Sequence, residues 1–253
     1  MHRCFVEPVN WAEDVVVLPR DESHHLLHVL RAAKGDSVNL FDGTGNEAEA
    51  RIASVKDQNA TLEIVRTSKA SRQHIMFTLI QSLPKSRKMD LIVEKATELG
   101  ISEISPVITE RTVTRLNPRR CAAHSERWLR LARSASKQCG TPWIPKINPV
   151  MTYPEALNMC SHFDALLVGT LEPGTISLTE AIHTLKQQSP RKIAFLIGPE
   201  GDLTANEVDA ARCAGGIAVS FGTLVLRVET AALYAMSILS YEFTGGNFLK
   251  SPQ

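Results

Sequence analysis

The sequence has no hydrophobic run that approaches the roughly 18 residues of a membrane-spanning helix. Its first sixteen residues turn acidic by Glu7 and contain no apolar segment typical of a signal peptide. We therefore expect a chain with no membrane contact that works in the cytoplasm. With 43% hydrophobic and 22% charged residues, the 253-residue chain otherwise has the composition of a globular protein of one large or two ordinary domains.

Cysteine is scarce, and the common ligand-binding motifs are missing. The five cysteines are scattered and include no C-x-x-C pair, which argues against a disulfide framework or a zinc site and predicts reduced thiols. Neither a G-x-x-x-x-G-K-[ST] phosphate loop nor G-x-G-x-x-G occurs. The histidines of "HHLLHVLR" (24–31) lack a carboxylate or thiol at ligand spacing, so we expect no metal and interpret them as surface or RNA-facing imidazoles.

Aromatic residues make up only 6% of the chain, so a stacking platform for single-stranded nucleic acid is not expected. The net charge of +1 hides a segregation, because residues 73–150 carry thirteen Lys/Arg against six Asp/Glu, a net +7. On a helical wheel Arg127, Arg130, Arg133 and Lys137 fall within an arc of about 120°. The charge fits a polyanion contact and equally a solvated, arginine-rich helix face.

Residues 1–70 read as a small β-rich domain. Strand-like stretches at 36–43, 46–55 and 60–67 follow a short helix over 21–31, for which Ser23 or Asp21 is the candidate cap. The glycines of the turn "DGTGN" (42–46) can adopt positive φ. The polar, basic segment 66–74 is the expected boundary.

Residues 71–253 alternate strands with helices, which predicts an α/β domain with a mostly parallel sheet. Thr204 and Glu207 form a capping box at the start of one helix. The expected strands are 74–83, 101–109, 163–170, 192–198 and 216–222. The expected helices are 86–100, 117–140 with Asn117 as its cap, 177–188, 204–215 and about 230–242.

Three of these strands end in glycine-bearing loops: "LLVGTLEPG", "FLIGPEGDLT" and "VSFGTLVLR". In open α/β sheets, ligands bind at the carboxyl ends of the strands. The Gly198–Gly201 turn leads into a helix, where backbone N–H groups can face a ligand. Taken alone, this turn favours a purely structural β–α connection, since tight turns use glycine and proline for structure alone.

An isolated pair of opposite charges lies in an otherwise apolar run. Between Arg212 and Glu242 the only charged residues are Arg227 and Glu229, whose side chains would share one side of an extended segment. One interpretation is a buried ion pair that supports the last helix, with Glu229 near its N-terminus. The other, which we favour, is a polar floor in an apolar pocket, with Glu200 joining from the neighbouring loop.

Four ordered segments resemble the RsmE family of methyltransferases over about residues 2–242. They are "HHLLHVLRAAKGDSVNLFDGTGNEAEARI", "KMDLIVEKATELGISEISPVITERTV", "LIGPEGDLTANEV" and "VLRVETAAL". The resemblance implies S-adenosylmethionine-dependent methylation of N3 of a uridine in small-subunit ribosomal RNA, free or in the assembled subunit. It further implies an RNA-binding PUA-like β-barrel (1–70), a SPOUT-type domain with a C-terminal trefoil knot (71–253) and a homodimer.

The resemblance also assigns residues to roles. The cofactor would be held, bent, by the knot loops through Val168, Gly169, Thr170, Ile197, Gly198, Pro199, Gly201, Phe221, Gly222, Leu224, Leu226 and Thr230. Arg227, Glu229 and Glu200 are the expected catalytic residues: Arg227 stabilises the anionic uracil oxygens, and Glu229 or Glu200 accepts hydrogen bonds from the cofactor or the base. The residues expected to contact RNA are Arg3, Arg31, Lys85, Arg111, Arg115, Arg130 and Arg133.

Three positions depart from the family pattern: Asp202 replaces a glycine, Val228 a threonine and Thr141 an arginine. Two alternatives to the implied function remain. One is a non-catalytic RNA-binding or ribosome-assembly module with the same fold. The other is a SPOUT methyltransferase that acts on transfer RNA, against which the N-terminal "HHLLHVLR…GD…LFDG" block argues.

Overall fold

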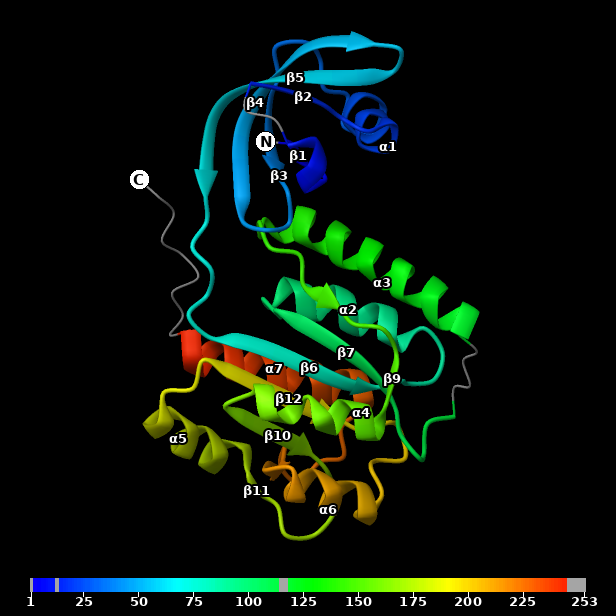
Figure 1. Ribbon diagram of the computed structural model, residues 1–253, viewed down its shortest axis with the longest axis vertical. Coiled ribbons are helices and arrows are strands. Elements are labelled where there is room, and N and C mark those ends of the chain that lie inside the picture. Colours follow the sequence, from blue (N-terminus) through cyan, green and yellow to red (C-terminus); the bar gives the residue numbers. More distant parts are fainter. Residues whose placement is uncertain (1, 12–13, 114–117, 245–253) are drawn as a thin grey trace. The chain divides into compact units, whose positions relative to one another are not determined.

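A computed structural model of the chain describes residues 2–11, 14–113 and 118–244 (Figure 1). The predicted helix cap Asn117 and the predicted RNA contact Arg115 lie outside the described residues. The chain forms two compact units. Unit 1 comprises Met1–Arg72 with Arg133–Ile144, and unit 2 comprises Gln73–Ala132 with Pro145–Gln253.

Unit 1 contains a five-stranded sheet with the order β1-β3-β4-β5-β2. β1 pairs in parallel with β3, and the other neighbours are antiparallel. The three predicted strands are confirmed, whereas the edge strands β1 and β2 are too short for their alternation to be recognised in the sequence. The bounds are β1 (His2–Phe5), β2 (Val15–Val17), β3 (Ser37–Phe41), β4 (Asn46–Lys56) and β5 (Asn59–Lys69).

The short helix predicted near the N-terminus is present as α1 (Arg20–His24), continued by a π-helical turn (His25–Val29). The cap predicted at Ser23 or Asp21 was wrong, because the helix begins earlier and Pro19 occupies the N-cap position. The buried Ser23 hydroxyl instead bonds two backbone groups of the core, donating to one carbonyl and accepting from one N–H. The Ser23 hydroxyl, of a type that often caps helices, here links the helix to the core of the domain.

Residues 133–144, which we assigned from the sequence to the second domain, pack in unit 1. The indole of Trp143 lies against Gly45, and the guanidinium of Arg72 lies 5.2 Å from the centroid of the Trp143 ring. A backbone bridge joins Thr44 to Trp143. The absence of a side chain at Gly45 therefore lets this aromatic ring pack against the turn at 42–46.

Unit 2 contains an eight-stranded sheet with the order β11-β13-β10-β12-β6-β7-β8, in which β9 also pairs with β7. Every pairing is parallel, which confirms the predicted α/β architecture with a parallel sheet. The bounds are β6 (Met76–Ser82), β7 (Glu103–Ile108), β8 (Lys146–Ile147), β9 (Met151–Thr152), β10 (Ala165–Gly169), β11 (Ile176–Ser177), β12 (Lys192–Ile197) and β13 (Gly216–Ser220).

The predicted long helices are confirmed, and one short helix was missed. The capping box of Thr204 and Glu207 opens α6 as predicted. The missed helix, α4, carries its own capping box at Thr152 and Glu155, a signal that was present in the sequence. The bounds are α2 (Lys88–Glu98), α3 (Pro118–Cys139), α4 (Tyr153–Asn158), α5 (Leu178–Gln188), α6 (Ala205–Cys213) and α7 (Val228–Thr244).

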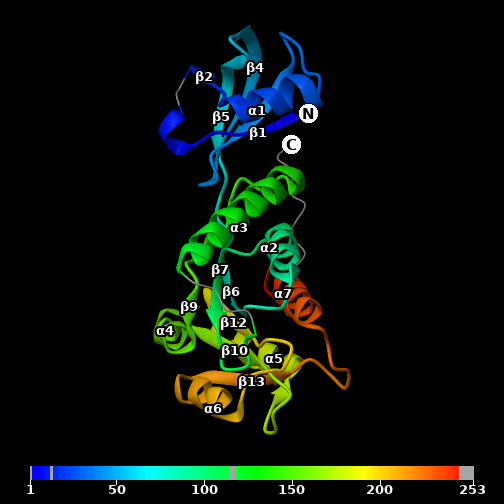
Figure 2. The same ribbon diagram turned by 90° about the vertical axis from the view of Figure 1, so that its right-hand side faces the viewer.

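Helices cover both faces of the parallel sheet. Figure 2 shows α2 and α7 on one side of the strands and α4 on the other. The α4 and α6 side is closed by one apolar cluster that includes Ala156, Leu166, Leu196 and Val208. Because both faces are covered, the sheet leaves its strand ends as the place where a ligand can bind. Among the described residues, no helix has both the length and the apolar character that crossing a membrane requires.

A matched pair of glycine variants tests the packing of Trp143. Gly45 and Gly35 both have a φ of +96°, but a Cβ at Gly45 would lie 2.3 Å from the Trp143 ring, whereas a Cβ at Gly35 would meet nothing within 4 Å. We expect Gly35→Ala to lower the free energy of unfolding by about 1–2 kcal/mol through backbone strain alone. Gly45→Ala should add about 1–3 kcal/mol of overpacking, measured by urea unfolding. Equal losses in the two variants would contradict the predicted packing.

Candidate active site

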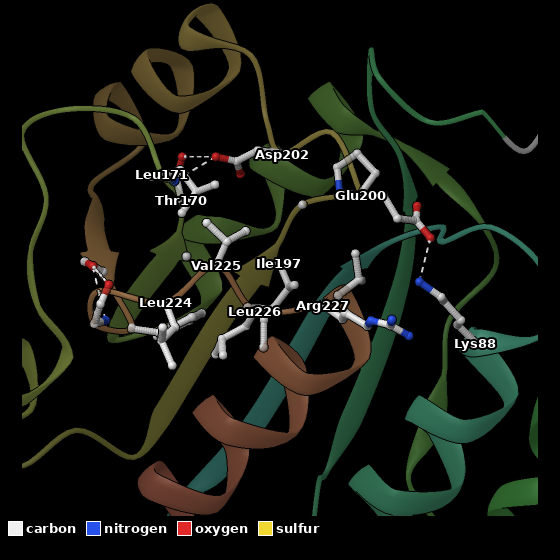
Figure 3. Close-up of a pocket in the computed structure, with 18 residues that line it drawn as sticks. Lys88, Thr170, Leu171, Ile197, Glu200, Asp202, Leu224, Val225, Leu226 and Arg227 are labelled. Atoms are coloured by element: carbon white, nitrogen blue, oxygen red, sulfur yellow. Dashed lines mark hydrogen bonds and ion pairs between the residues drawn. The ribbon is translucent and has the colours of Figure 1, made fainter.

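A cavity of about 400 Å³ lies at the carboxyl ends of β10, β12 and β13 (Figure 3). The loops that follow these three strands form most of its wall, together with the first residue of α2 and the start of α7. The lining residues are Lys88, Gly169, Thr170, Leu171, Ile197, Gly198, Pro199, Glu200, Asp202, Ser220, Phe221, Gly222, Leu224, Val225, Leu226, Arg227, Val228 and Ala231. The convergence of three loops that the sequence predicted is thus confirmed.

Strand register brings these loops together. β10 lies between β12 and β13, and Gly169 at its end is level with Ile197 of β12 and Val219 of β13. A Cβ at Gly169 would lie 2.7 Å from the Phe221 ring, and one at Gly198 would lie 2.9 Å from the backbone nitrogen of the next turn. Gly198 is thus closed by backbone, where a side chain cannot be accommodated, whereas at Gly169 the missing side chain leaves room for the Phe221 ring.

Asp202 links two of the loops. Its Oδ2 accepts hydrogen bonds from Oγ1 of Thr170 (2.9 Å) and from the backbone N–H of Leu171 (2.7 Å), and its Oδ1 accepts one from the N–H of Leu203 (2.8 Å). The residue adopts a φ of +61°, a conformation that glycine takes without strain. The departure from the family's glycine therefore keeps that backbone conformation and adds a carboxylate that joins the β10 loop to the β12 loop.

Most residues predicted to hold a cofactor line this cavity. Nine of the twelve do so: Gly169, Thr170, Ile197, Gly198, Pro199, Phe221, Gly222, Leu224 and Leu226. Val168 is instead buried in the sheet, Thr230 is exposed on α7, and Gly201 faces Arg111, so these three lie beside the lining. Two lining residues, Lys88 and Leu171, were not predicted: Leu171 lies within "LLVGTLEPG" but received no role, and Lys88 lies outside the three glycine-bearing loops and the isolated charge pair.

Arg227 and Glu229 lie at one end of the site, but the assumption of an extended segment was wrong. α7 begins at Val228, and the carbonyl of Arg227 accepts the N–H of Ala231 in the first helical turn. The two side chains therefore do not form the ion pair that we considered from the sequence. Arg227 is exposed and lines the cavity, and Glu229 pairs with Lys88.

Glu200 joins this charged end of the cavity, as Figure 3 shows. Its carboxylate accepts the backbone N–H of Lys85 (3.0 Å) and lies 3.2 Å from Nζ of Lys88. Partial burial alone would raise the pKa of Glu200, but the hydrogen bonds from backbone N–H groups and from Lys88 outweigh it and lower the pKa. Glu200 is therefore ionised at neutral pH.

The site consequently has two chemically different parts. One is apolar, formed by Ile197, Leu224, Leu226 and Ala231, and is suited to a flat, weakly polar group. The other carries the charges of Lys88, Glu200 and Arg227 and is suited to a polar or ionised group. Among the described residues, no group of three or more His, Cys, Asp or Glu side chains could hold a metal ion.

The basic face predicted on α3 is largely neutralised within the chain. Three of its four cations pair with carboxylates: Arg127 with Asp90 (2.7 Å), Arg133 with Glu7 (2.8 Å) and Lys137 with Glu22 (2.8 Å). The guanidinium of Arg133 also lies 3.9 Å from the centroid of the Phe5 ring. Arg130 is exposed and has no partner among the described residues, so it is the member of this face that stays available to a phosphate.

The other predicted RNA contacts differ in their surroundings. Arg31 and Lys85 are exposed. Arg3 is largely covered, pairing with Glu47 and lying over an aromatic ring. Arg111 is exposed, but its Nη1 donates to the carbonyl of Gly201 (2.7 Å), which fixes the β12 loop. Part of the predicted set thus serves intramolecular contacts.

Two family models match the chain. One, described as an RNA methyltransferase domain, matches residues 71–240, and the other, described as an RNA methyltransferase PUA domain, matches residues 18–65. Together with the parallel sheet and the cavity at its carboxyl edge, these matches define the protein as an RNA methyltransferase. Comparison with individual relatives identifies the family within this class.

The ribosomal RNA small subunit methyltransferase E of Bacillus subtilis is 31% identical over 225 residues, 88% of each chain. That of Synechocystis is 29% identical over 93% of this chain and 76% of its own. The same enzyme from Neisseria gonorrhoeae, solved bound to S-adenosyl methionine, superposes with a TM-score of 0.83 at 32% identity, covering 94% of this chain and 96% of that one. The chain belongs to the ribosomal RNA small subunit methyltransferase E family.

The link made by Asp202 can be tested without any ligand. Asp202→Gly removes the carboxylate and leaves the positive φ unstrained, so any loss reports on the hydrogen bonds. We expect the Leu171 amide to exchange its hydrogen about 10- to 100-fold faster, as for the loss of a hydrogen bond to a charged group. Hydrogen-exchange mass spectrometry of the β10 loop measures this. Asp202→Asn should have a smaller effect, and unchanged exchange in Asp202→Gly would contradict the link.

Proposed function

We propose that the protein methylates N3 of a uridine in small-subunit ribosomal RNA, with S-adenosylmethionine as the methyl donor. The observation that carries the proposal is the cavity formed by three glycine-bearing loops at the carboxyl edge of the sheet. The relatives named as methyltransferases of small-subunit RNA support the substrate, and the Neisseria gonorrhoeae structure with bound S-adenosyl methionine supports the donor. The RsmE resemblance supplies the N3 position.

The residues present fit this cofactor. A cavity of about 400 Å³ is within the usual size range of small-molecule sites. The apolar wall of Leu224 and Leu226 suits an adenine ring, and Gly169 and Gly198 line the cavity with no side chain between their backbone and a ligand. When bound, S-adenosylmethionine supplies a methyl group on a positively charged sulfur atom.

The charged end of the cavity would act on the uracil. The N3 proton must leave before methylation because the neutral imide nitrogen is a poor nucleophile, and the resulting anion spreads its charge onto the uracil oxygens. Arg227 lines the cavity and is suited to stabilise a planar anion of this kind. Glu200 and Glu229 are the candidates for accepting a hydrogen bond from the cofactor or from the base. The chain thus contributes positioning and charge stabilisation.

A trefoil knot in the C-terminal part of residues 71–253 belongs to the same proposal. The strand order supports it, because β13 lies between β10 and β11 although β11 directly follows β10 in the chain. The segment 170–175 therefore has to cross the chain that enters or leaves β13. A homodimer is also proposed, supported by exposed apolar side chains on α2 and α7 that a second subunit could cover: Leu91, Tyr234 and Tyr241.

Residues 1–70 would serve as the RNA-binding PUA-like β-barrel, as the PUA family model over residues 18–65 supports. Residues 71–253 would form the catalytic domain, as the model over 71–240 supports. A ribosomal substrate implies that the protein works in the cytoplasm. The alternatives remain a non-catalytic RNA-binding module, which need not bind S-adenosylmethionine, and a methyltransferase of transfer RNA, which would not modify the small subunit.

The role of Arg227 is tested with Arg227→Ala. We expect the methylation rate of small-subunit RNA to fall about 10²- to 10³-fold, as when one donor to a developing anion is removed. The affinity for S-adenosylmethionine, measured by calorimetry, should change little because the guanidinium acts on the base. Arg227→Lys should recover part of the rate. A folded Arg227→Ala protein that methylates at the parent rate would refute the role, and a parent protein that binds RNA but not the cofactor would favour the non-catalytic module.

The contribution of Arg130 to RNA binding is tested by charge reversal. Arg130→Glu should weaken binding of small-subunit RNA and reduce the slope of log affinity against log salt concentration by about one, the value for one lost phosphate contact. Arg191→Glu provides a control with the same charge change. Arg191 is exposed and directly precedes β12, at the end of the strand away from the cavity. Equal affinities of the two variants across the salt series would count against this contact.

A further inference from the structure

We propose that Lys88 is a further catalytic residue, whose ammonium contacts the uracil and stabilises the N3 anion, and that Glu200 and Glu229 hold this ammonium in place. The inference rests on the proposed function and assigns roles to two carboxylates that the sequence left interchangeable. Lys88 opens the segment "KMDLIVEKATELGISEISPVITERTV" that carries part of the family resemblance, but neither the resemblance nor the loop glycines assigned it a role.

The Lys88 ammonium is held between two carboxylates from different segments. Nζ lies 3.2 Å from Oε1 of Glu200, in the β12 loop, and 3.2 Å from Oε2 of Glu229, in the first turn of α7. An ammonium carries three N–H donors. Of its two contacts, the one with Glu200 has hydrogen-bond geometry, whereas Glu229 lies at ion-pair distance without a well-aligned hydrogen bond. Because Lys88 lines the cavity, a donor is available to an oxygen of the ligand.

Lys88 and Arg227 lie at the same end of the cavity. Both line it, and in Figure 3 the Arg227 side chain extends toward the side on which Lys88 and Glu200 lie. A uracil that has lost its N3 proton carries negative charge on two carbonyl oxygens, one on each side of N3. Two cations at one end of the cavity match these two oxygens, whereas a single guanidinium would leave one of them to water.

Lys88 is suited to act as a fixed positive charge. The hydrogen bond to Glu200 and the neighbouring Glu229 carboxylate raise its pKa above the ordinary value, although partial burial acts in the opposite direction. As the first residue of α2, Lys88 lies where the helix dipole disfavours a cation. The two carboxylates offset this cost and keep the ammonium protonated at the pH of the reaction.

Both carboxylates face the Lys88 ammonium. Glu200 is bonded by the backbone N–H of Lys85 and by Lys88, and its lowered pKa makes it a weak base. Oε2 of Glu229 is buried, receives no well-aligned hydrogen bond from the described residues, and faces the Lys88 ammonium at ion-pair distance. Both are thereby committed to Lys88.

The reaction then needs no dedicated base on the protein. The N3–H bond of the uridine breaks, and its proton goes to solvent hydroxide or water, because the cations lower the pKa of the bound base. The N3 electron pair forms the bond to the methyl carbon, and the electrons of the carbon–sulfur bond remain on sulfur. The products are N3-methyluridine and a neutral thioether, so that atoms and charge balance.

The test compares Lys88→Met and Lys88→Arg with Lys95→Met. Lys95 is a matched control, because it also contacts two carboxylates on α2 (Glu94 and Glu98, each at 2.8 Å) and does not line the cavity. Two quantities are measured: the dissociation constant for S-adenosylmethionine by calorimetry without RNA, and the single-turnover methylation rate of small-subunit RNA between about pH 6 and 10. Glu200 and Glu229, which pair with Lys88, and Arg227, which lines the same cavity, stay unchanged in all three variants.

We expect Lys88→Met to bind the cofactor within about twofold of the parent. Its methylation rate at neutral pH should fall at least about tenfold, and the pH at which the rate reaches its plateau should rise by about one unit or more, as for the loss of one nearby opposite charge. Lys88→Arg should restore most of the profile, and Lys95→Met should match the parent. A plateau at the parent pH in Lys88→Met would overturn the inference. So would a more than tenfold loss of cofactor affinity with an unshifted profile, which would assign Lys88 to the cofactor's carboxylate.

If Lys88→Met does not fold, Glu229→Gln tests the inference instead, since glutamine has nearly the same shape as glutamate. If Glu229 only positions the Lys88 ammonium, the methylation rate should be lower but should still rise with pH. Disappearance of this rise would identify Glu229 as the base and overturn the inference. A parent protein that methylates small-subunit RNA at no pH would refute the proposed function, and this inference with it. A methylating parent with an unshifted Lys88→Met profile would refute this inference alone.

Discussion

The parallel order of β10, β12 and β13, which brings the three loops that follow them to one edge of the sheet, is the constraint on which the site depends. β10 is flanked by two parallel strands, so the loops that leave all three strands must share one edge of the sheet. A Cβ at Gly169 would lie 2.7 Å from the Phe221 ring, so the absence of a side chain there lets this ring of the β13 loop pack against the end of β10. The cavity is therefore a consequence of strand order and of one glycine, and the side chains that line it are added to a backbone already in place.

Charges at this edge are arranged so that each anion has a defined partner. Asp202 bonds the β10 loop, and Glu200 and Glu229 share Lys88. Arg227 differs, since it lines the cavity with no such bond among the described residues. Fixed anions with available cations are what a site needs when negative charge develops on its substrate, because the cations then require little rearrangement during the reaction.

The sequence predicted the elements whose signals are local. Alternation marked β3, β4 and β5, a capping box marked α6, and glycines marked the three loops of the cavity. Contacts across long stretches of chain carry no such signal: Lys88 lies 112 residues from Glu200. The same limit affected α3, where the cations of a basic segment pair with acidic residues drawn from elsewhere in the chain. The net charge of a stretch of sequence is therefore a poor measure of the charge that its helix presents to a ligand, because ion pairs with other segments neutralise part of it.

At Lys88, the preference of a helix N-terminus and the arrangement of the site favour different residue types. A cation at the first position of a helix is unfavourable for that helix, and an uncharged residue would stabilise α2 equally well or better. Positions where a sequence breaks such a rule are expected at functional sites, provided that other contacts offset the cost. Here the offset comes from two carboxylates, one in the β12 loop and one in the first turn of α7. Lys95, seven residues further on, forms ion pairs with two acidic neighbours on the same helix. A lysine on α2 can therefore be paired without carboxylates from the cavity wall. The ion pairs that Lys88 forms with other segments are thus explained by its place in the cavity rather than by the stability of the helix.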